Sequence, residues 1–299
     1  MEQQLKFRTV LLLVLLTMIW GLTFPATKIA LDGFPPMLLA GSRFLVAGII
    51  VFLVSLKRDH HVRQQSRGNC GILFLYTLML VVQIIFLFFG ILHTTANRSS
   101  ILFNTSPFWV LFLAVFYLPE EQLSLHKWIG TLIAFLGVLV LFADRRPDSI
   151  GDSLAGDLLV LGAAVTWGVR IIILKHFPRE MGVVTIQLWQ FIVGGGILTT
   201  LGLFIENVGD IHLNIHIVMA FLFLAVVSNA IGFALWTYLV IKEVATRVAP
   251  FLFLTPLFGV FASALLLDEL ITLPIVISLV GVGCGIFVVN RRDRGKSIS

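Results

Sequence analysis

The stretch Leu16–Gly33 reads LTMIWGLTFPATKIALDG and sets the character of the whole chain. It is apolar enough to enter a lipid bilayer, yet it carries Pro25 and Lys28. Trp20, Phe24 and Lys28 are spaced four residues apart, so they share one face of a helix. Because Pro25 removes one helical hydrogen bond, we expect the helix to bend or open there. A lysine in such a segment is costly unless it faces protein, water or a ligand.

The composition extends this apolar character to the whole chain. Of its 299 residues, 58% are hydrophobic and 12% are charged, whereas soluble domains carry about 25% charged residues. The sequence therefore predicts a polytopic membrane protein. Its net charge of +5 does not indicate a nucleic-acid partner, because the basic residues sit in short loops between apolar runs. The two cysteines lie in or beside apolar segments, so we expect no disulfide framework, metal site or cofactor.

Ten segments are candidates for membrane spans, each of which needs roughly 20 apolar residues. Backbone groups exposed to lipid must be hydrogen-bonded internally, so we expect every span to be a helix in an all-α membrane protein. The segments lie at 9–30, 36–56, 70–92, 99–118, 127–142, 158–176, 183–204, 215–240, 246–267 and 272–290.

The distribution of basic residues predicts the orientation. With a cytoplasmic N-terminus, fifteen basic residues fall on the cytoplasmic side and only Arg98, Arg145 and Arg146 on the other. The positive-inside rule then places both termini in the cytoplasm, in a bacterial inner (plasma) membrane. Lys6 and Arg8 before an apolar run also fit a signal peptide, but no small-residue cleavage site follows, so we expect this segment to be retained.

An internal repeat divides the chain into two halves. The triplet Trp20, Gly21 and Lys28 recurs 147 residues later, and further matches follow at offsets of 147 to 149. They pair Phe44, Gly48, Pro107 and Glu121 with Phe191, Gly195, Pro256 and Glu269. Each half holds five spans, an odd number, so the halves would insert as inverted repeats with a site near the membrane midplane. We assign 1–142 and 158–299 to the repeats and 143–157 to the linker.

Several stretches carry a family resemblance that covers nearly the whole chain. They are WGLTFPATKIAL, RFLVAGII, NTSP with EEQLS after it, and the second-half echoes WG, PLFG and DELIT. With these the chain resembles the ten-helix, EamA-like members of the drug/metabolite transporter superfamily. The resemblance implies two inverted five-helix repeats around a central cavity, and transport, often export, of small metabolites. It implies no particular substrate. The halves differ where Arg43 pairs with Gln190 and Thr23 with Arg170.

Four basic residues of the predicted spans bear on the site. Lys28, near the outer end of the first span, either reaches the headgroups or faces a functional cavity, whereas Lys175 is expected to reach the headgroups. Arg43 and Arg170 sit deeper and are too costly to face lipid. They either tie helices together or bind an anionic or zwitterionic substrate, because the planar guanidinium suits carboxylate and phosphate groups.

Uncharged polar residues and tryptophans complete the candidate site. Each polar residue either bridges two helices or lines the cavity, and Pro107 strengthens the case for Asn104 by freeing backbone groups nearby. Each tryptophan either packs in the core or offers a ligand an apolar wall with one donor. The candidate substrate-binding residues are Trp20, Thr23, Lys28, Arg43, Gln83, Asn104, Trp167, Arg170, Gln190, Asn229 and Trp236.

The charges inside the spans favour one class of substrate. No acidic residue or histidine lies in mid-span, whereas a pump for cationic drugs needs a buried carboxylate. We therefore expect a secondary transporter, an exporter or exchanger, that moves a small anionic or zwitterionic metabolite, such as an amino acid or organic acid, by alternating access.

Two other classes of protein were weighed. A membrane enzyme is disfavoured, because the chain has no paired carboxylates, H-E-x-x-H or G-x-S-x-G. The alternative that stays open is a channel or a structural membrane subunit without a transport cycle, although a selective pore would use rings of like residues from an oligomer. The expected partners are the small-molecule substrate and the lipid bilayer, with no nucleic acid. A homodimer is open, because Gly281 and Gly285 form a G-x-x-x-G pair.

Overall fold

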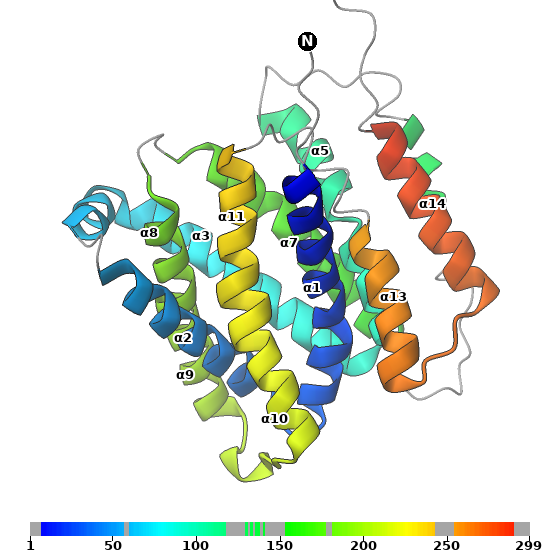
Figure 1. Ribbon diagram of the computed structural model, residues 1–299, viewed down its shortest axis with the longest axis horizontal. Helices are drawn as coiled ribbons and strands as arrows, with labels where there is room; N and C mark the ends of the chain where they lie inside the picture. The colour runs from blue at the N-terminus through cyan, green and yellow to red at the C-terminus, as the bar shows by residue number, and fades with distance from the viewer. Residues whose placement is uncertain are drawn as a thin grey trace, which may run out of the picture.

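The protein is a bundle of long apolar helices (Figure 1). The computed structural model describes residues 7–56, 60–117, 129–130, 132–133, 135–137, 140, 153–177, 181–242 and 254–289. Within these residues the chain forms helices and connecting turns, with no strand. Six helices in the described ranges are long and apolar enough to cross a membrane, and two shorter helices are also apolar. The all-helical, multi-pass membrane fold predicted from the sequence is thus confirmed, while the count of ten spans stays a prediction.

The first helix, α1 (Phe7–Leu31), stays helical across Pro25. The helix therefore does not open at the proline, and a bend there, the other expected outcome, stays a prediction. The physical reason lies in its packing against α13 (Leu254–Leu267): a methyl group at Gly21 would lie 2.7 Å from Cβ of Phe258, closer than side-chain carbons approach each other. Contacts of this kind hold a helix in place despite the loss of one backbone hydrogen bond.

The next two helices are α2 (Pro36–Ser55) and α3 (His60–His93). Pro36 stands in the first turn of α2, where its fixed φ favours the helix and its missing N–H costs nothing. Helix α3 begins ten residues before the predicted span and kinks at Asn69, with φ −131° and ψ 20°. Part of the polar stretch predicted as a loop is therefore helical, and the apolar section runs from Gly68 to His93.

The fourth predicted span is broken into two helices, α4 (Ala96–Phe103) and α5 (Ser106–Tyr117). The break falls at Asn104 and Thr105. Pro107 has no N–H to donate to the Phe103 carbonyl one turn earlier, and the Asn104 Nδ2 donates to the Ser100 carbonyl at 2.7 Å. The expectation of one continuous helix over 99–118 is wrong for this reason. In the fifth span the described residues, among them 135–137, are helical, and the rest of 127–142 lies outside the description.

The second half begins with α7 (Leu154–Lys175), which Ser153 caps. The following span is built from α8 (Val183–Leu188), the π-helical segment η2 (Trp189–Gly194) and α9 (Gly195–Ile205). After the short turn η3 (Val208–Asp210) comes the span of α10 (Ile215–Leu222), π-helical η4 (Phe223–Ile231) and α11 (Gly232–Lys242). The last helices are α13 and α14 (Leu273–Val289). Helix α7 starts at Leu154, within the stretch 143–157 predicted as the linker.

Helices of the two halves pack against each other. Helix α1 contacts α13 and the α10–η4–α11 span, and Figure 1 shows it between α11 and α13. Helix α7 contacts α3, α4 and α5, while α2 packs against α8, η2 and α9. In the last part of the chain Gly281 lies against Gly137: a methyl group at Gly281 would be 2.9 Å from the Cα of Gly137 in the same chain.

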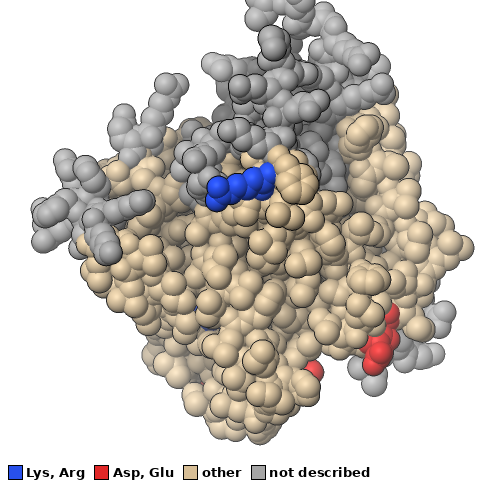
Figure 2. All heavy atoms as spheres, in the orientation of Figure 1, with Lys and Arg blue, Asp and Glu red and all other residues tan. Residues whose placement is uncertain are grey.

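The surface suits a lipid environment. Many large hydrophobic side chains are exposed, among them Phe52, Phe204 and Leu265. Figure 2 shows few charged side chains on the viewed face: basic ones lie at the end near the N-terminus and acidic ones at the opposite end. The uncharged band between them is what a bilayer core requires.

Candidate functional site

Arg170, which lies on α7, is the centre of a buried polar group. Only 2% of its surface is exposed. Its Nη1 donates to the Gln83 Oε1 at 2.6 Å, and its Nη2 donates to the Gln190 Oε1. Its guanidinium carbon lies 4.7 Å from the ring centroid of Tyr76 and 5.3 Å from that of Trp167. We call these five residues the Arg170 group; four of them are residues that the sequence singled out.

Local structure explains how the group assembles. Trp167 and Arg170 lie three residues apart on α7 and so project from one face. Gln83 comes from the middle of α3, which packs along α7. Gln190 lies in η2, where π-helical geometry replaces the α-helix; such segments are frequent at functional sites. The Arg170 side chain thus joins three helical elements through amide oxygens and ring faces.

Arg43, on α2, is buried in a different way. It is 3% exposed, and its guanidinium carbon lies 4.6 Å from the ring centroid of Phe88 and 5.0 Å from that of Phe44. Among the described residues, no atom accepts a hydrogen bond from its Nε or Nη1. Arg43 therefore carries donors that the fold leaves unused, whereas both terminal nitrogens of Arg170 are occupied.

A chain of aromatic rings runs from Arg43 toward α1. The rings of Phe44 and Phe191 stack at 5.6 Å, and Phe191 meets Phe233 edge-on at 5.5 Å. Phe233 lies 5.9 Å from Trp20, which lies 5.5 Å from Trp236. Two predicted tryptophans, Trp20 and Trp236, thus share one aromatic wall, built from α2, η2, α11 and α1.

Three other predicted residues lie outside these groups. The Thr23 hydroxyl is 2.9 Å from that of Ser228 and ties α1 to η4. Asn229 is 2% exposed, and within the described structure its Nδ2 has no hydrogen-bond partner. Asn104 closes the turn between α4 and α5, as described above.

Lys28 holds the turn between α3 and α4. Its Nζ donates to the carbonyl oxygens of Ile91, Leu92 and Thr94 at 2.8, 3.2 and 2.8 Å. A cation at this place satisfies orphan carbonyls and offsets the negative end of the helix dipole. In this conformation Lys28 contacts the protein at the end of α3 rather than the Arg170 group.

Glu269, which sequence reasoning did not assign to the site, holds the same turn from the other side. Its carboxylate accepts hydrogen bonds from the backbone N–H groups of Ala96 and Asn97, both at 2.8 Å. Burial raises the pKa of the Glu269 carboxyl, while these two N–H groups and the charge of Lys28 act in the opposite direction. Glu269 matches Glu121 in the internal repeat, and this match is the sequence signal that could have identified it.

Asp157 is a second residue that the sequence did not single out. It lies fully buried in the first turn of α7 and forms a salt bridge with Arg98 of α4. The Arg98 Nε donates to its Oδ1 at 3.2 Å, and the Thr94 hydroxyl donates to the same oxygen at 2.7 Å. The α3–α4 turn is therefore fastened to α1, α7 and the α13–α14 connection by charged side chains.

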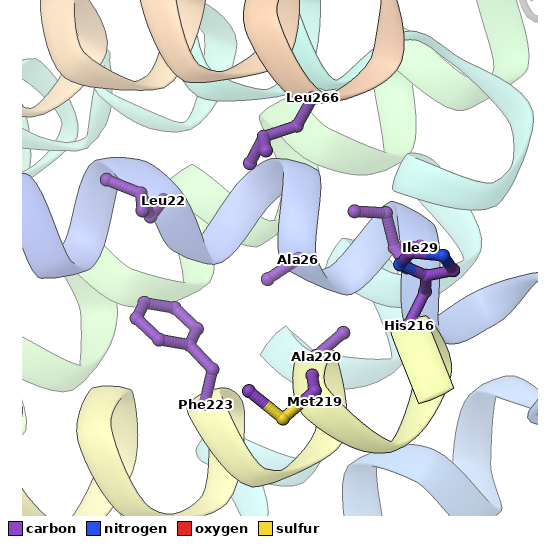
Figure 3. A pocket seen from close by; sticks show the side chains of 8 residues that line it. All are labelled: Leu22, Ala26, Ile29, His216, Met219, Ala220, Phe223 and Leu266. Carbon is purple, nitrogen blue, oxygen red and sulfur yellow. The ribbon is translucent and has the colours of Figure 1, made fainter. Parts of the chain in front are cut away.

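A cavity of about 210 Å³ opens on another side of the molecule (Figure 3). It lies between α1, the α10–η4 segment and α13, and its walls are apolar side chains such as Leu22, Phe223 and Leu266, with His216 at one end. None of the predicted substrate-binding residues lines it. The predicted substrate-binding residues and this cavity are thus separate features of the described structure.

Comparison with known proteins matches the chain to transporters. Residues 7–143 and 154–291 each match the EamA-like transporter family. The chain is 29% identical over 307 residues to the uncharacterized transporter YvbV of Bacillus subtilis, covering 99% of this chain and 96% of that one. It is also 29% identical to a probable amino-acid metabolite efflux pump of Escherichia coli, covering 87% of each chain. A crystal structure that is 18% identical superposes with a TM-score of 0.69 over 95% of this chain and 96% of that one, which shows a shared fold.

Proposed function

Because the chain belongs to the EamA-like transporter family, we propose that it is a secondary transporter that exports or exchanges a small anionic or zwitterionic metabolite by alternating access. The observation that carries the proposal is a pair of buried guanidinium groups: Arg43 lies on α2, which packs against η2, and Arg170 on α7 donates to Gln190 of η2. Neither is paired with a carboxylate in the part of the chain described. Cations in such a place attract an anionic group on a cargo.

Reciprocal contacts support the inverted-repeat architecture on which alternating access depends. Gly21 meets Phe258, and its repeat partner Gly168 meets Trp109, where a methyl group would lie 2.9 Å from the tryptophan Cβ. Phe258 and Trp109 are themselves 149 residues apart, the offset of the surrounding repeat. Inverted repeats built this way let one half rock against the other around a central site. We propose residues 1–142 and 158–299 as the two repeats.

The relatives support the class of cargo. Proteins of Escherichia coli and Salmonella typhimurium, each 29% identical to this chain, are named as probable amino-acid metabolite efflux pumps. An amino acid or a related organic acid carries the carboxylate that the buried arginines would bind. We propose export of such a compound across the bacterial inner membrane, with both termini in the cytoplasm.

A counterflow experiment tests this function. Proteoliposomes that contain the purified chain are loaded with one unlabelled amino acid or organic acid, and uptake of the labelled compound is followed. A transporter gives a saturable overshoot of labelled compound, because outward movement of the unlabelled cargo drives inward exchange. A channel, the alternative class, gives neither saturation nor overshoot. Absence of overshoot for every amino acid and organic acid tried would reject the proposal.

A further inference from the structure

The two buried arginines differ in what their N–H groups contact. Arg170 donates from Nη1 and Nη2 to the amide oxygens of Gln83 and Gln190. Arg43 is buried to the same degree, yet its Nε and Nη1 meet no acceptor in the described ranges. A buried donor of a charged group that is left without an acceptor carries the full cost of its desolvation. Both terminal nitrogens of Arg170 therefore have acceptors, whereas Nη1 of Arg43 has none in the described ranges, and the Nε of each arginine is without an acceptor there.

The repeat explains why the two arginines differ at their terminal nitrogens. Arg43 and Gln190 occupy equivalent positions, 147 residues apart, beside the stacked rings of Phe44 and Phe191. In the second half, the position holds an amide that accepts from Arg170. In the first half, it holds a cation, and the residue equivalent to Arg170 is Thr23, which bonds to Ser228 instead. The sequence difference between the halves thus accounts for the terminal nitrogen of Arg43, Nη1, that has no acceptor among the described residues.

The described surroundings of Arg43 do not supply the missing acceptor. Phe44 and Phe88 attract its charge through their ring faces. A ring face, however, does not replace an oxygen as acceptor for the N–H groups in the guanidinium plane. With no acceptor among the described residues, we take the oxygen acceptor to come from water or from a ligand, and a carboxylate gives the stronger, charge-assisted bond.

From these contacts, and resting on the proposed function, we propose a division of labour between the arginines. Arg43 receives the carboxylate of the cargo, and its Nε and Nη1 are among the donors. Arg170 remains bound to Gln83 and Gln190 and is a positioning residue that fixes η2 against α3 and α7. The cargo class is accordingly a compound with one carboxylate, and the charge selectivity of the transporter resides in Arg43.

Matched pairs of ligands test the assignment. Each common amino acid is compared with its own carboxamide, which has the same side chain and amino group but lacks the negative charge. The measured quantity is the ratio of the apparent affinities of acid and amide, from competition of counterflow in proteoliposomes and from thermal stabilisation of the purified protein. The variants are Arg43→Gln, Arg43→Lys and Arg170→Gln, and Arg8→Gln at the exposed start of α1 is the matched control.

The proposal predicts a different pattern for each variant. The wild type and Arg8→Gln prefer the acid. Arg43→Gln loses about 10- to 100-fold in affinity for the acid, so that the ratio approaches one. Arg43→Lys keeps the charge and retains part of the preference, and it replaces the glutamine variant as the test should that variant not fold. Arg170→Gln lowers the unfolding temperature of the ligand-free protein but keeps the preference for the acid.

Three outcomes would overturn the proposal. An unchanged ratio in folded Arg43→Gln, or a ratio lost in Arg170→Gln alone, would show that the assignment is reversed. Counterflow by the wild type with equal affinity for acid and amide would reject the role of Arg43 while the transport function stands. A wild type without counterflow of any compound would reject the transport function, and this inference with it.

Discussion

Phe44 and Phe191 stack their rings with centroids 5.6 Å apart and an interplanar angle of 24°, although 147 residues separate them in the chain. The glycine one turn after each phenylalanine lies against the phenylalanine of the other half. A methyl group at Gly48 would lie 3.2 Å from the Cβ of Phe191, and one at Gly195 would lie 3.1 Å from that of Phe44. Equivalent residues that meet one another mark the place where the halves face each other, and the two buried arginines lie beside it.

Replacing Gly21 by alanine is expected to destabilise the protein. The added methyl group would lie 2.7 Å from the Phe258 Cβ and 2.8 Å from the Thr255 carbonyl oxygen, so α1 and α13 must separate. We expect a loss of about 1–3 kcal/mol, seen as a lower unfolding temperature in detergent. Gly196→Ala is the control, because a methyl group there meets nothing within 4 Å. Equal behaviour of the two variants would contradict the packing argument.

Removing the charge of Asp157 is expected to be more damaging than removing the whole ion pair. Asp157→Asn leaves the buried Arg98 guanidinium without its counter-charge, a change that typically costs about 3–5 kcal/mol. The double variant Arg98→Met, Asp157→Leu removes both charges and should be closer to the wild type. Thermal unfolding of the three proteins in one detergent gives the comparison. A double variant less stable than Asp157→Asn would count against it.

Lys28→Met is expected to loosen the α3–α4 turn. The substitution removes the cation that binds the carbonyl oxygens of Ile91, Leu92 and Thr94. Hydrogen bonds to a charged group contribute about 1.5–3 kcal/mol, so the unfolding temperature should fall, and hydrogen exchange at residues 94–98 should accelerate. Lys28→Arg keeps a cation and should restore most of the protection. Unchanged exchange in Lys28→Met would show that the turn does not depend on this contact.

Glu269 predicts a dependence of stability on pH. Burial raises its pKa above the ordinary 4.5, so the folded protein binds this proton more tightly than the unfolded chain. The stability contributed by this proton is complete below pH 4.5 and is lost as the pH rises through the raised pKa. The unfolding temperature of the wild type relative to Glu269→Gln should therefore fall with increasing pH across that window. A relative stability that rises with pH would show that the pKa is lowered instead.

The orientation in the membrane is testable with a single cysteine. In a background of Cys70→Ser and Cys284→Ser, Ile150→Cys lies in the predicted outer loop. We expect an impermeant thiol reagent to label it in intact cells, because fifteen of the basic loop residues fall on the opposite side. Labelling only after the cells are opened would refute the topology.

Much of the candidate site could be predicted from residue type and from the position of the residue within its predicted span. The sequence predicts Arg170, Gln83 and Gln190 because polar groups inside a span need partners, and Trp167 because an interior indole offers a ligand an apolar wall with one donor. The structure brings these four together. Lys28 and Asn104 were chosen by the same reasoning, but they contact backbone carbonyls at turns. Residue type and depth do not distinguish a side chain that lines a cavity from one that closes a helix end.

The sequence by itself determined the membrane character, the helical spans and the repeat, because a bilayer requires each long apolar segment to satisfy its own backbone hydrogen bonds. Only the tertiary structure decided that α1 continues through Pro25, that α4 and α5 are separate, and that Asp157 and Glu269 are tied to the α3–α4 turn. It also decided which arginine has acceptors, since Arg170 meets two amides from other elements and Arg43 meets ring faces. These outcomes depend on contacts between residues far apart in the chain, and local periodicity does not encode which distant side chains meet.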